Sequence, residues 1–203
     1  MILGINAVQS PIDYGVYSKP HSVKISWDGF GAIEDLPKRL ADFLVDFPKL
    51  SGLFTVLGPG NYTGIRLALT TIKMISKVHC IPWLGMSLFD AYLRVNPTED
   101  LTLLTSASRK GWLNMQLFQS SNGEPIPISS INQIQVASID GWISQFQAPI
   151  FWGHFGLDEF NFNHKPRRIS LDILSVASFF ESEILSVTQT SSVAPIYSYP
   201  AVQ

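Results

Sequence analysis

Three glycines and one arginine lie at spacings that could build a site for an anion. Gly58, Gly60 and Gly64 belong to the segment LGPGNYTGIR, which follows the apolar run LFTVL and precedes the periodic segment LALTTIKMISKV. A strand, a glycine turn and a helix start present free backbone N–H groups to a phosphate, and Arg66 would add a positive charge. Glycine also permits a tight reversal and close contact between a helix and a strand, so the spacing has to distinguish a ligand site from a structural corner.

The spacing fits neither of the two common nucleotide motifs. The dinucleotide fingerprint is G-x-G-x-x-G, and this segment has one additional residue before its last glycine. The phosphate loop requires Lys and then Ser or Thr after its last glycine, whereas Ile65 and Arg66 follow Gly64. We therefore interpret the segment as a structural turn and keep a phosphate site as the alternative. The turn consists of Gly58, Pro59, Gly60, Thr63, Gly64 and Arg66.

Side chains that hold metals are sparse. Cys80 is the only cysteine, so it offers neither an internal disulfide nor a metal cluster. No two histidines are four residues apart, the spacing that places two ligands on one helix face. The histidines are His21, His79, His154 and His164. We expect no metal.

Carboxylates near strand ends are the remaining candidates for catalysis. Asp13, Asp28 and Asp90 lie where turns and helix caps also favour Asp, so we interpret them as structural. Nucleotide-binding actin-like folds place an Asp at the end of their first strand, where it holds the waters of a metal ion. Asn6 takes that position in INAVQSPIDYG, and an amide lacks the charge that binds Mg²⁺ well. The pattern predicts no catalytic residue and no cofactor.

Composition favours a folded cytoplasmic protein without a membrane segment. The chain has 203 residues, of which 46% are hydrophobic and only 15% charged, and its net charge is −2. It shows no signal peptide and no apolar run near the roughly 18 residues of a membrane span. The small basic groups Arg109–Lys110 and Lys165–Arg168 do not predict an independent nucleic-acid binder. The mean hydropathy of +0.18 indicates either a generous core or apolar surface covered by a partner.

Periodicity predicts a meander of three strands at the start of the chain, then two helices separated by the buried strand LFTVL, and then the short strand IPWLG. ILGINAV, YGVYS and HSVKISW alternate as an antiparallel meander. A helix is expected from Leu36, with Asp35 as its N-cap and with Leu36, Leu40 and Phe43 on its apolar face. A second helix, residues 64–78 with Thr63 as its N-cap, follows the glycine turn.

The second helix is apolar on two nearly opposite sides. One stripe contains Ile65, Leu69, Ile72 and Ile75, and the other contains Leu67, Met74 and Val78 with Thr71 beside them. A helix with this pattern is buried on both sides. One side can cover a sheet, and the other needs a second layer from this chain or from another chain.

The second half is predicted to form a separate lobe. A short helix, SLFDAYLRV with Ser87 as cap, ends at the polar break 96–100, so we expect lobes at residues 1–95 and 96–203. LTLLTSA and GWLNMQLFQ are predicted strands. Ser138 and Ser170 are the expected caps of two further helices, the second of which covers residues 170–185.

The central block LGPGNYTGIRLALTTIKMISKVHCIPWLGMSLFDAYL resembles the TsaB (YeaZ) family. That family's block runs G-P-G-S-F-T-G, an aliphatic residue and R, then a helix and a strand that ends G-V-S-S-L. The turn residues match it, and so do Gly85, Ser87 and Leu88. The opening ILGIN and the terminal PIYSYP are similar to the family's I-L-A-I-D and P-x-Y-L-R. Ser106 and Ser108 stand where the family has the Asp and Arg of its D-A-R segment.

The resemblance implies an actin-like (ASKHA, ribonuclease H-like) α/β fold with two lobes of mixed sheets flanked by helices. It implies the dimerisation subunit of the bacterial machinery that makes threonylcarbamoyladenosine in tRNA. A TsaD-type paralogue would carry the ATP-dependent chemistry, and a TsaE-type ATPase would take part. The paralogue's paired histidines have no counterpart in MSLFDAYL.

The resemblance also implies how partners are contacted. The chain alone would form a homodimer through its first two helices, the TsaD-type partner would use the same surface, and tRNA would be reached only through the complex. The expected interface residues are Leu36, Leu40, Phe43, Leu67, Thr71, Met74 and Val78. Two alternatives stay open: an actin-like nucleotide-binding or glycoprotease-like enzyme, and a homodimer without a role in tRNA modification.

Overall fold

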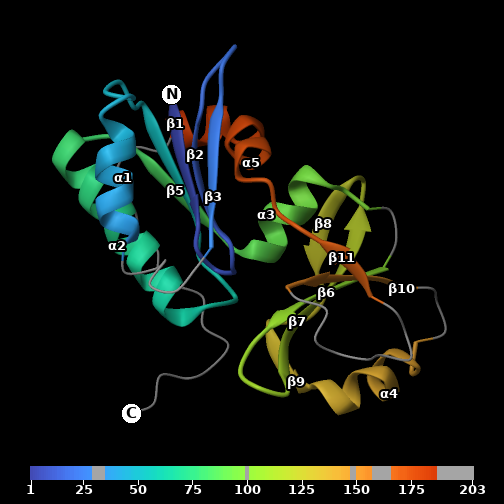
Figure 1. The fold of residues 1–203 in the computed structure, drawn as a ribbon. Coiled ribbons are helices and arrows are strands. Elements are labelled where there is room, and N and C mark those ends of the chain that lie inside the picture. Colours follow the sequence, from blue (N-terminus) through green and yellow to red (C-terminus); the bar gives the residue numbers. More distant parts are fainter. Residues whose placement is uncertain (29–34, 99–100, 147–149, 157–165, 187–203) are drawn as a thin grey trace. The chain divides into compact units, whose positions relative to one another are not determined.

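The chain folds into two compact units in the computed structural model (Figure 1). The structure describes residues 1–28, 35–98, 101–146, 150–156 and 166–186. The first unit contains Met1–Leu88 and the described residues from Asp172 onward, and the second begins at Phe89 and ends at Leu171. His164 and the terminal PIYSYP segment lie outside the described residues.

The sheet of the first unit combines the expected meander with two parallel strands, in the order β3-β2-β1-β4-β5. β1 pairs antiparallel with β2, and β2 with β3, whereas β4 lies parallel to both β1 and β5. Every residue of β1 and β4 is buried, as expected for central strands that are covered on both faces. The strands are β1 (Ile2–Asn6), β2 (Ile12–Tyr17), β3 (Val23–Trp27), β4 (Gly52–Val56) and β5 (Trp83–Met86).

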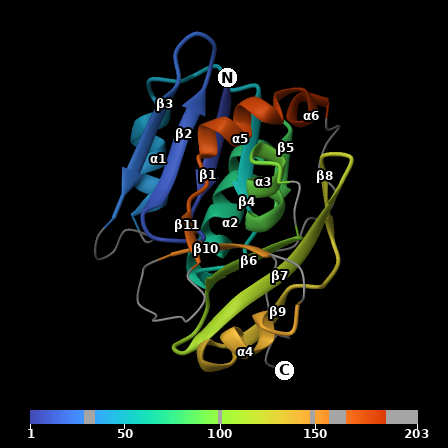
Figure 2. The ribbon, with the colours of Figure 1, turned by 90° about the vertical axis from the view of Figure 1, so that its right-hand side faces the viewer.

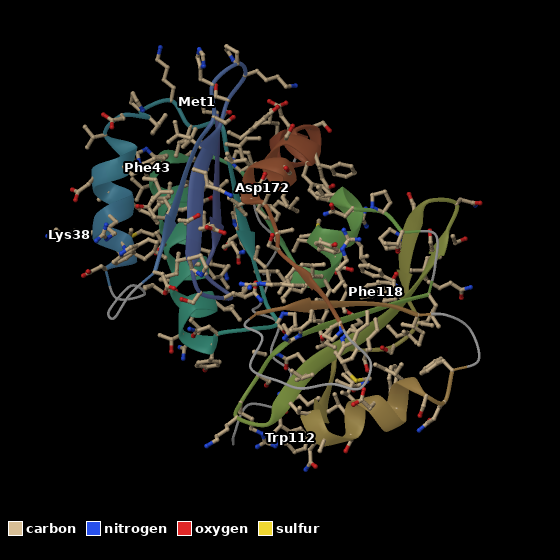
Figure 3. All side chains as sticks on the ribbon, turned by 45° about the vertical axis from the view of Figure 1, so that its right-hand side comes forward. Met1, Lys38, Phe43, Trp112, Phe118 and Asp172 are labelled. Carbon is tan, nitrogen blue, oxygen red and sulfur yellow. The ribbon has the colours of Figure 1, made fainter. Side chains whose placement is uncertain are left out.

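Two helices cover one face of this sheet (Figures 1 and 2). α1 (Leu36–Leu44) and α2 (Tyr62–His79) pack their apolar stripes onto the core residues of β1, β2 and β4. Phe43 of α1 meets Tyr14 of β2 edge to face at 5.3 Å, and Lys38 points away from the sheet (Figure 3). Asp35 precedes α1 as expected, but its side chain makes no capping hydrogen bond.

The opposite face is covered by α5 (Ile173–Phe179) and α6 (Glu181–Ser186). Ile173 lies against Gly4 of β1, and Ile184 lies against Gly52 of β4. We predicted one helix over residues 170–185 with Ser170 as its cap. The structure has two shorter helices instead, and Asp172 caps the first by accepting a hydrogen bond from the Ser175 backbone N at 3.2 Å.

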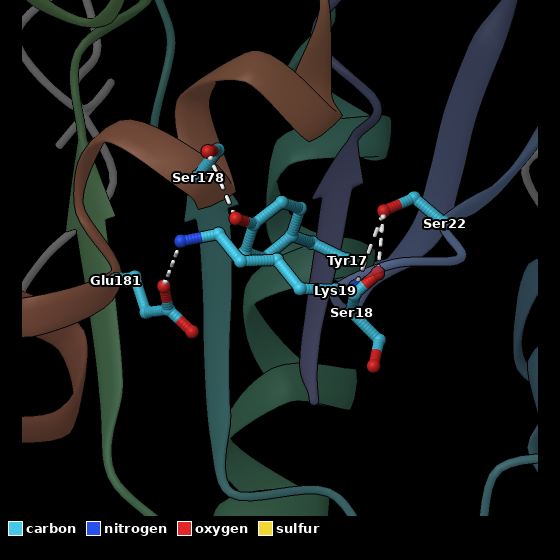
Figure 4. Close-up of polar contacts among 6 residues, drawn as sticks. All are labelled: Tyr17, Ser18, Lys19, Ser22, Ser178 and Glu181. Carbon is cyan, nitrogen blue, oxygen red and sulfur yellow. Dashed lines mark hydrogen bonds and ion pairs between the residues drawn. The ribbon is translucent and has the colours of Figure 1, made fainter.

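Polar contacts also fasten these two helices to the meander (Figure 4). The hydroxyl of Ser178 donates to the Tyr17 hydroxyl at 3.0 Å, and the Lys19 ammonium lies 3.5 Å from the Glu181 carboxylate. We expected a single lobe boundary near residue 96. The chain divides after Leu88 and returns to the first unit at Asp172. It returns because the apolar faces of α5 and α6 pack against the sheet of the first unit.

Asp172 joins the two parts of the first unit electrostatically. Its carboxylate lies 3.1 Å from the Lys24 ammonium on β3 and accepts the Ser175 hydroxyl at 2.7 Å. Partial burial alone would raise the pKa of Asp172, but the hydrogen bonds from Ser175 and Lys24 and the charge of Lys24 hold that pKa below its usual value.

The second unit contains a mixed sheet in the order β11-β10-β6-β7-β8, in which β9 also pairs with the long β7 (Figure 2). Leu103, Met115 and Trp152 line one face of the sheet beneath α4. α3 covers the other face, where Tyr92 meets Phe155 edge to face at 5.3 Å. The elements are α3 (Leu88–Val95), β6 (Leu101–Ala107), β7 (Trp112–Ser121), β8 (Glu124–Pro127), β9 (Asn132–Gln135), the 3-10 helix Val136–Ser138, α4 (Ile139–Ile143), β10 (Ile150–Phe155) and β11 (Arg167–Ile169).

Candidate partner-binding surface

The glycine turn leads into α2 two residues earlier than predicted. α2 begins at Tyr62, and Asn61 is its N-cap, with the side-chain Oδ1 accepting a hydrogen bond from the Gly64 backbone N at 3.2 Å. We predicted Thr63 as the cap. That prediction is wrong, because the backbone N of Asn61 is already held by the Val8 carbonyl at 2.7 Å, which fixes the point where the chain turns into the helix.

The turn is filled by the chain's own backbone. A Cβ atom on Gly60 would lie 2.2 Å from the Val8 carbonyl oxygen, and one on Gly64 would lie 2.0 Å from the Ala7 carbonyl oxygen. Only glycine leaves enough room for the segment after β1 to approach so closely. Carbonyl oxygens repel an anion, so these two sides of the turn serve packing between the turn and the segment after β1.

Asn6 is part of the same packing. Its side chain is 3% exposed, and its Oδ1 lies 3.3 Å from the backbone N of Val8, from which it accepts a hydrogen bond. Asn6 therefore holds the backbone of Val8, whose carbonyl contacts the glycine turn.

The inner face of α2 forms the core, as its sequence predicted. Ile65, Leu69, Ile72 and Ile75 are all buried against the sheet. Thr71 is also buried, and its hydroxyl donates to the Leu67 carbonyl at 2.8 Å within the helix.

The outer face of α2 is open. Met74 and Val78 are 57% and 69% exposed, and Leu67 is half-buried. A hollow of about 300 Å³ adjoins Leu67 at the first turns of the helix. It is lined by Tyr62, Thr63, Arg66, Leu67 and Thr70. No described part of this chain supplies the second layer that the two-sided helix requires.

The structure separates the seven expected interface residues into two groups. Leu36, Leu40, Phe43 and Thr71 lie in the core of the first unit, so their side chains cannot contact a partner in this conformation. We expected Leu36, Leu40 and Phe43 of α1 to help contact the partner, but a helix with a single apolar stripe uses that stripe for its own sheet. Thr71 belongs to the buried side of α2. Leu67, Met74 and Val78 remain at the surface.

This surface also contains polar residues that were not among the expected contacts, and two of them, Tyr62 and Arg66, interact with each other. Arg66 Nη1 donates to the Tyr62 hydroxyl at 3.0 Å, and the guanidinium carbon lies 5.3 Å from the centre of the Tyr62 ring. The separation of four residues was a readable signal, because residues at i and i+4 are neighbours on a helix. We define the outer face of α2 as Tyr62, Arg66, Leu67, Thr70, Lys73, Met74, Lys77 and Val78.

Thr105, Trp152 and His154 form a buried polar cluster in the second unit. The Trp152 indole N–H donates to the Thr105 hydroxyl at 2.9 Å, and the hydroxyl oxygen lies 2.9 Å from His154 Nδ1. All three side chains are buried beneath the sheet face that α4 covers. The Thr105 hydroxyl accepts a hydrogen bond from Trp152, and it can donate its own proton to His154 Nδ1.

Neither a metal site nor a membrane span occurs in the described part of the chain. No three His, Cys, Asp or Glu side chains gather there in a metal-binding arrangement. None of its helices is both long and apolar enough to cross a bilayer.

The two-lobed α/β architecture is similar to that of solved YeaZ-type structures. The fold is similar to one described as an uncharacterized protein with similarity to the peptidase YeaZ from Pseudomonas aeruginosa. That likeness has a TM-score of 0.66 at 13% sequence identity, and it covers 98% of this chain and 99% of that chain. YeaZ from Pseudomonas aeruginosa gives a TM-score of 0.61 at 14% identity, covering 90% of this chain and 92% of that one. No family model matches the chain, and no curated protein matches it.

These likenesses confirm the fold class. The chain has the actin-like (ribonuclease H-like) α/β fold with two lobes of mixed sheets that the resemblance implied. At such low identity the likeness concerns the fold.

Proposed function

We propose that this chain is a non-catalytic subunit that binds a TsaD-type enzyme and supports it in the threonylcarbamoyladenosine modification of tRNA. The carbamoyl-transfer chemistry would lie in the partner. The observation that carries the proposal is the open outer face of α2, where Met74 and Val78 are exposed on a helix whose inner face is fully used. The likeness of the fold to YeaZ-type structures supports the choice of partner.

The physical argument for a protein partner is the apolar area. Fully burying a Met or Val side chain contributes about 1.5 to 3 kcal/mol, and Met is enriched at protein interfaces. Leu67, Met74 and Val78 follow one another along the same side of the helix, so a partner can cover all three with one surface. The hollow beside Leu67 would accept a side chain from that partner.

The glycine turn supports a non-catalytic role. Phosphate sites at helix starts rely on free backbone N–H groups. Here the Gly64 N–H donates to the Asn61 side chain, and the Asn61 N–H donates to the Val8 carbonyl. Asn6 contributes a neutral amide to the same corner. These contacts favour a packed corner over a nucleotide site.

The test is co-purification with a TsaD-type protein from the same genome, using Met74→Arg and a matched control. We expect the wild-type chain to bind and Met74→Arg to lose the complex, because a charge would replace the centre of the apolar surface. Ile126→Arg is the control. Ile126 is 47% exposed on β8 of the second unit, so the chemical change is the same and binding should persist.

The alternatives give different results in the same experiments. A wild-type chain that ignores the TsaD-type protein would contradict the proposal, and a dimer sensitive to Met74→Arg would then favour the stand-alone homodimer. ATP binding in the micromolar range by the chain alone, lost on Gly60→Ala, would favour the nucleotide-binding enzyme. In the source organism, deletion of the gene should remove threonylcarbamoyladenosine from tRNA, as measured by mass spectrometry of its nucleosides.

A further inference from the structure

The charged residues on the outer face of α2 are all basic. The helix, YTGIRLALTTIKMISKVH, contains Arg66, Lys73 and Lys77 and no Asp or Glu. At 3.6 residues per turn, these three cations lie within about 40° of arc around the helix axis and form one row. All three side chains are exposed.

This cationic row runs beside the apolar row. Leu67, Met74 and Val78 are centred about 100° around the helix from the cations, so the two rows are adjacent along the same exposed surface. Local contacts hold two of the cations in place. Arg66 is bonded to Tyr62, and the Lys73 ammonium lies 5.7 Å from the centre of the Trp83 ring.

We propose that this face binds a protein surface that carries a row of carboxylates next to an apolar strip. The inference rests on the proposed function and specifies the chemistry of the partner in that complex. Met74 and Val78 would supply the desolvated centre, while Lys73 and Lys77 would pair with the acidic edge. Complementary charges at an edge chiefly fix the register and raise the association rate.

The same pattern disfavours a second copy of this chain as the occupant. A two-fold dimer places the same patch on both sides of the interface. A dimer through this face would therefore bring two basic helices together, with no carboxylate on either α2 to compensate them. Like charges placed across an interface oppose association.

A nucleic acid fits the surface less well than a protein. Phosphate contacts would engage the three cations, but they would leave the apolar row of Leu67, Met74 and Val78 without a counterpart. The chain as a whole carries a net charge of −2, which does not attract a polyanion.

The experiment measures affinity for the TsaD-type protein after charge reversal. The test variant is Lys73→Glu/Lys77→Glu, with Lys77→Glu alone as a second variant. The control is Arg94→Glu/Lys110→Glu in the second unit, which makes the same change in net charge at exposed positions. We expect the test double variant to lose about tenfold or more in affinity and the control less than about twofold. Raising NaCl from about 0.05 to 0.5 M should weaken the wild-type complex and leave the residual binding of the test variant almost unchanged.

Each other outcome has a definite meaning. If the wild-type chain binds the TsaD-type protein and charge reversal changes nothing, the inference is wrong and the proposed function stands. If the wild-type chain does not bind that protein, the proposed function fails and the inference fails with it. If purified tRNA binds the wild-type chain directly, and reversal abolishes that binding alone, the basic row serves a nucleic acid. Circular dichroism of each variant verifies that the fold is retained.

Discussion

The glycine corner and the outer face of α2 are consecutive parts of one segment, yet they have opposite environments. At the corner, Gly60 and Gly64 are in contact with the backbone of Ala7 and Val8. Along the outer face, Met74 and Val78 are each more than half exposed. The part with the stronger sequence motif is closed by the chain itself, and the part with the weaker pattern is available to another molecule.

The difference shows what a glycine motif encodes. Closely spaced glycines indicate where another group comes close to the backbone. That group can be a neighbouring segment of the chain as readily as a phosphate. When a helix already packs one apolar stripe into the core, a second apolar row that stays exposed is not used in the chain's own packing. Such a row indicates a surface for binding another molecule. The comparison predicts that substitutions in the inner face and corner change stability, whereas substitutions on the outer face change binding.

The largest expected effect is on the inner face of α2. Ile72 is fully buried beneath the sheet, so Ile72→Ala should lower the free energy of unfolding by about 2 to 5 kcal/mol through lost burial and a residual cavity. Met74→Ala, two residues away on the outer face, should change it by less than about 0.5 kcal/mol. Urea unfolding followed by circular dichroism measures both. Equal losses would show that the outer face is also part of the core.

A somewhat smaller loss is expected at the corner. Gly64→Ala places a methyl group about where the Ala7 carbonyl lies, and the forced displacement should cost about 3 kcal/mol. Gly141→Ala in α4 is the matched control, because a Cβ atom there meets nothing within 4 Å. Alanine at that helical position should stabilise the protein by about 0.5 to 1 kcal/mol. If Gly64→Ala were as well tolerated as Gly141→Ala, the corner would not be closed as described.

Periodicity predicted the elements whose burial is decided locally. The meander of the first three strands and the inner stripe Ile65, Leu69, Ile72 and Ile75 were readable, because alternation and helical spacing report which side chains leave water. The same information placed Leu67, Met74 and Val78 in a second row on the helix, in which Met74 and Val78 are exposed and Leu67 is partly buried.

Contacts between distant parts of the chain were not readable in this way. The return of residues 172–186 to the first unit depends on Ile173 meeting Gly4 and on Ile184 meeting Gly52, pairs separated by more than a hundred residues. Leu36, Leu40 and Phe43 were expected at a partner surface and are buried in the chain's own core, for a related reason. A single amphipathic stripe shows that a helix is covered, but it does not show by what.

The smallest predicted loss concerns the cap that joins the corner to the helix. Asn61→Ala removes the acceptor of the Gly64 N–H and should cost about 1 kcal/mol, within the usual range for an N-cap. Thr63→Ala is the control, because Thr63 lies in the first turn of α2 and Ala is the better helix former there. It should leave the urea midpoint unchanged or raise it slightly. The reverse ranking of the two variants would restore Thr63 as the cap, would move the helix start by two residues, and would detach the turn from the Val8 carbonyl that now sets its position.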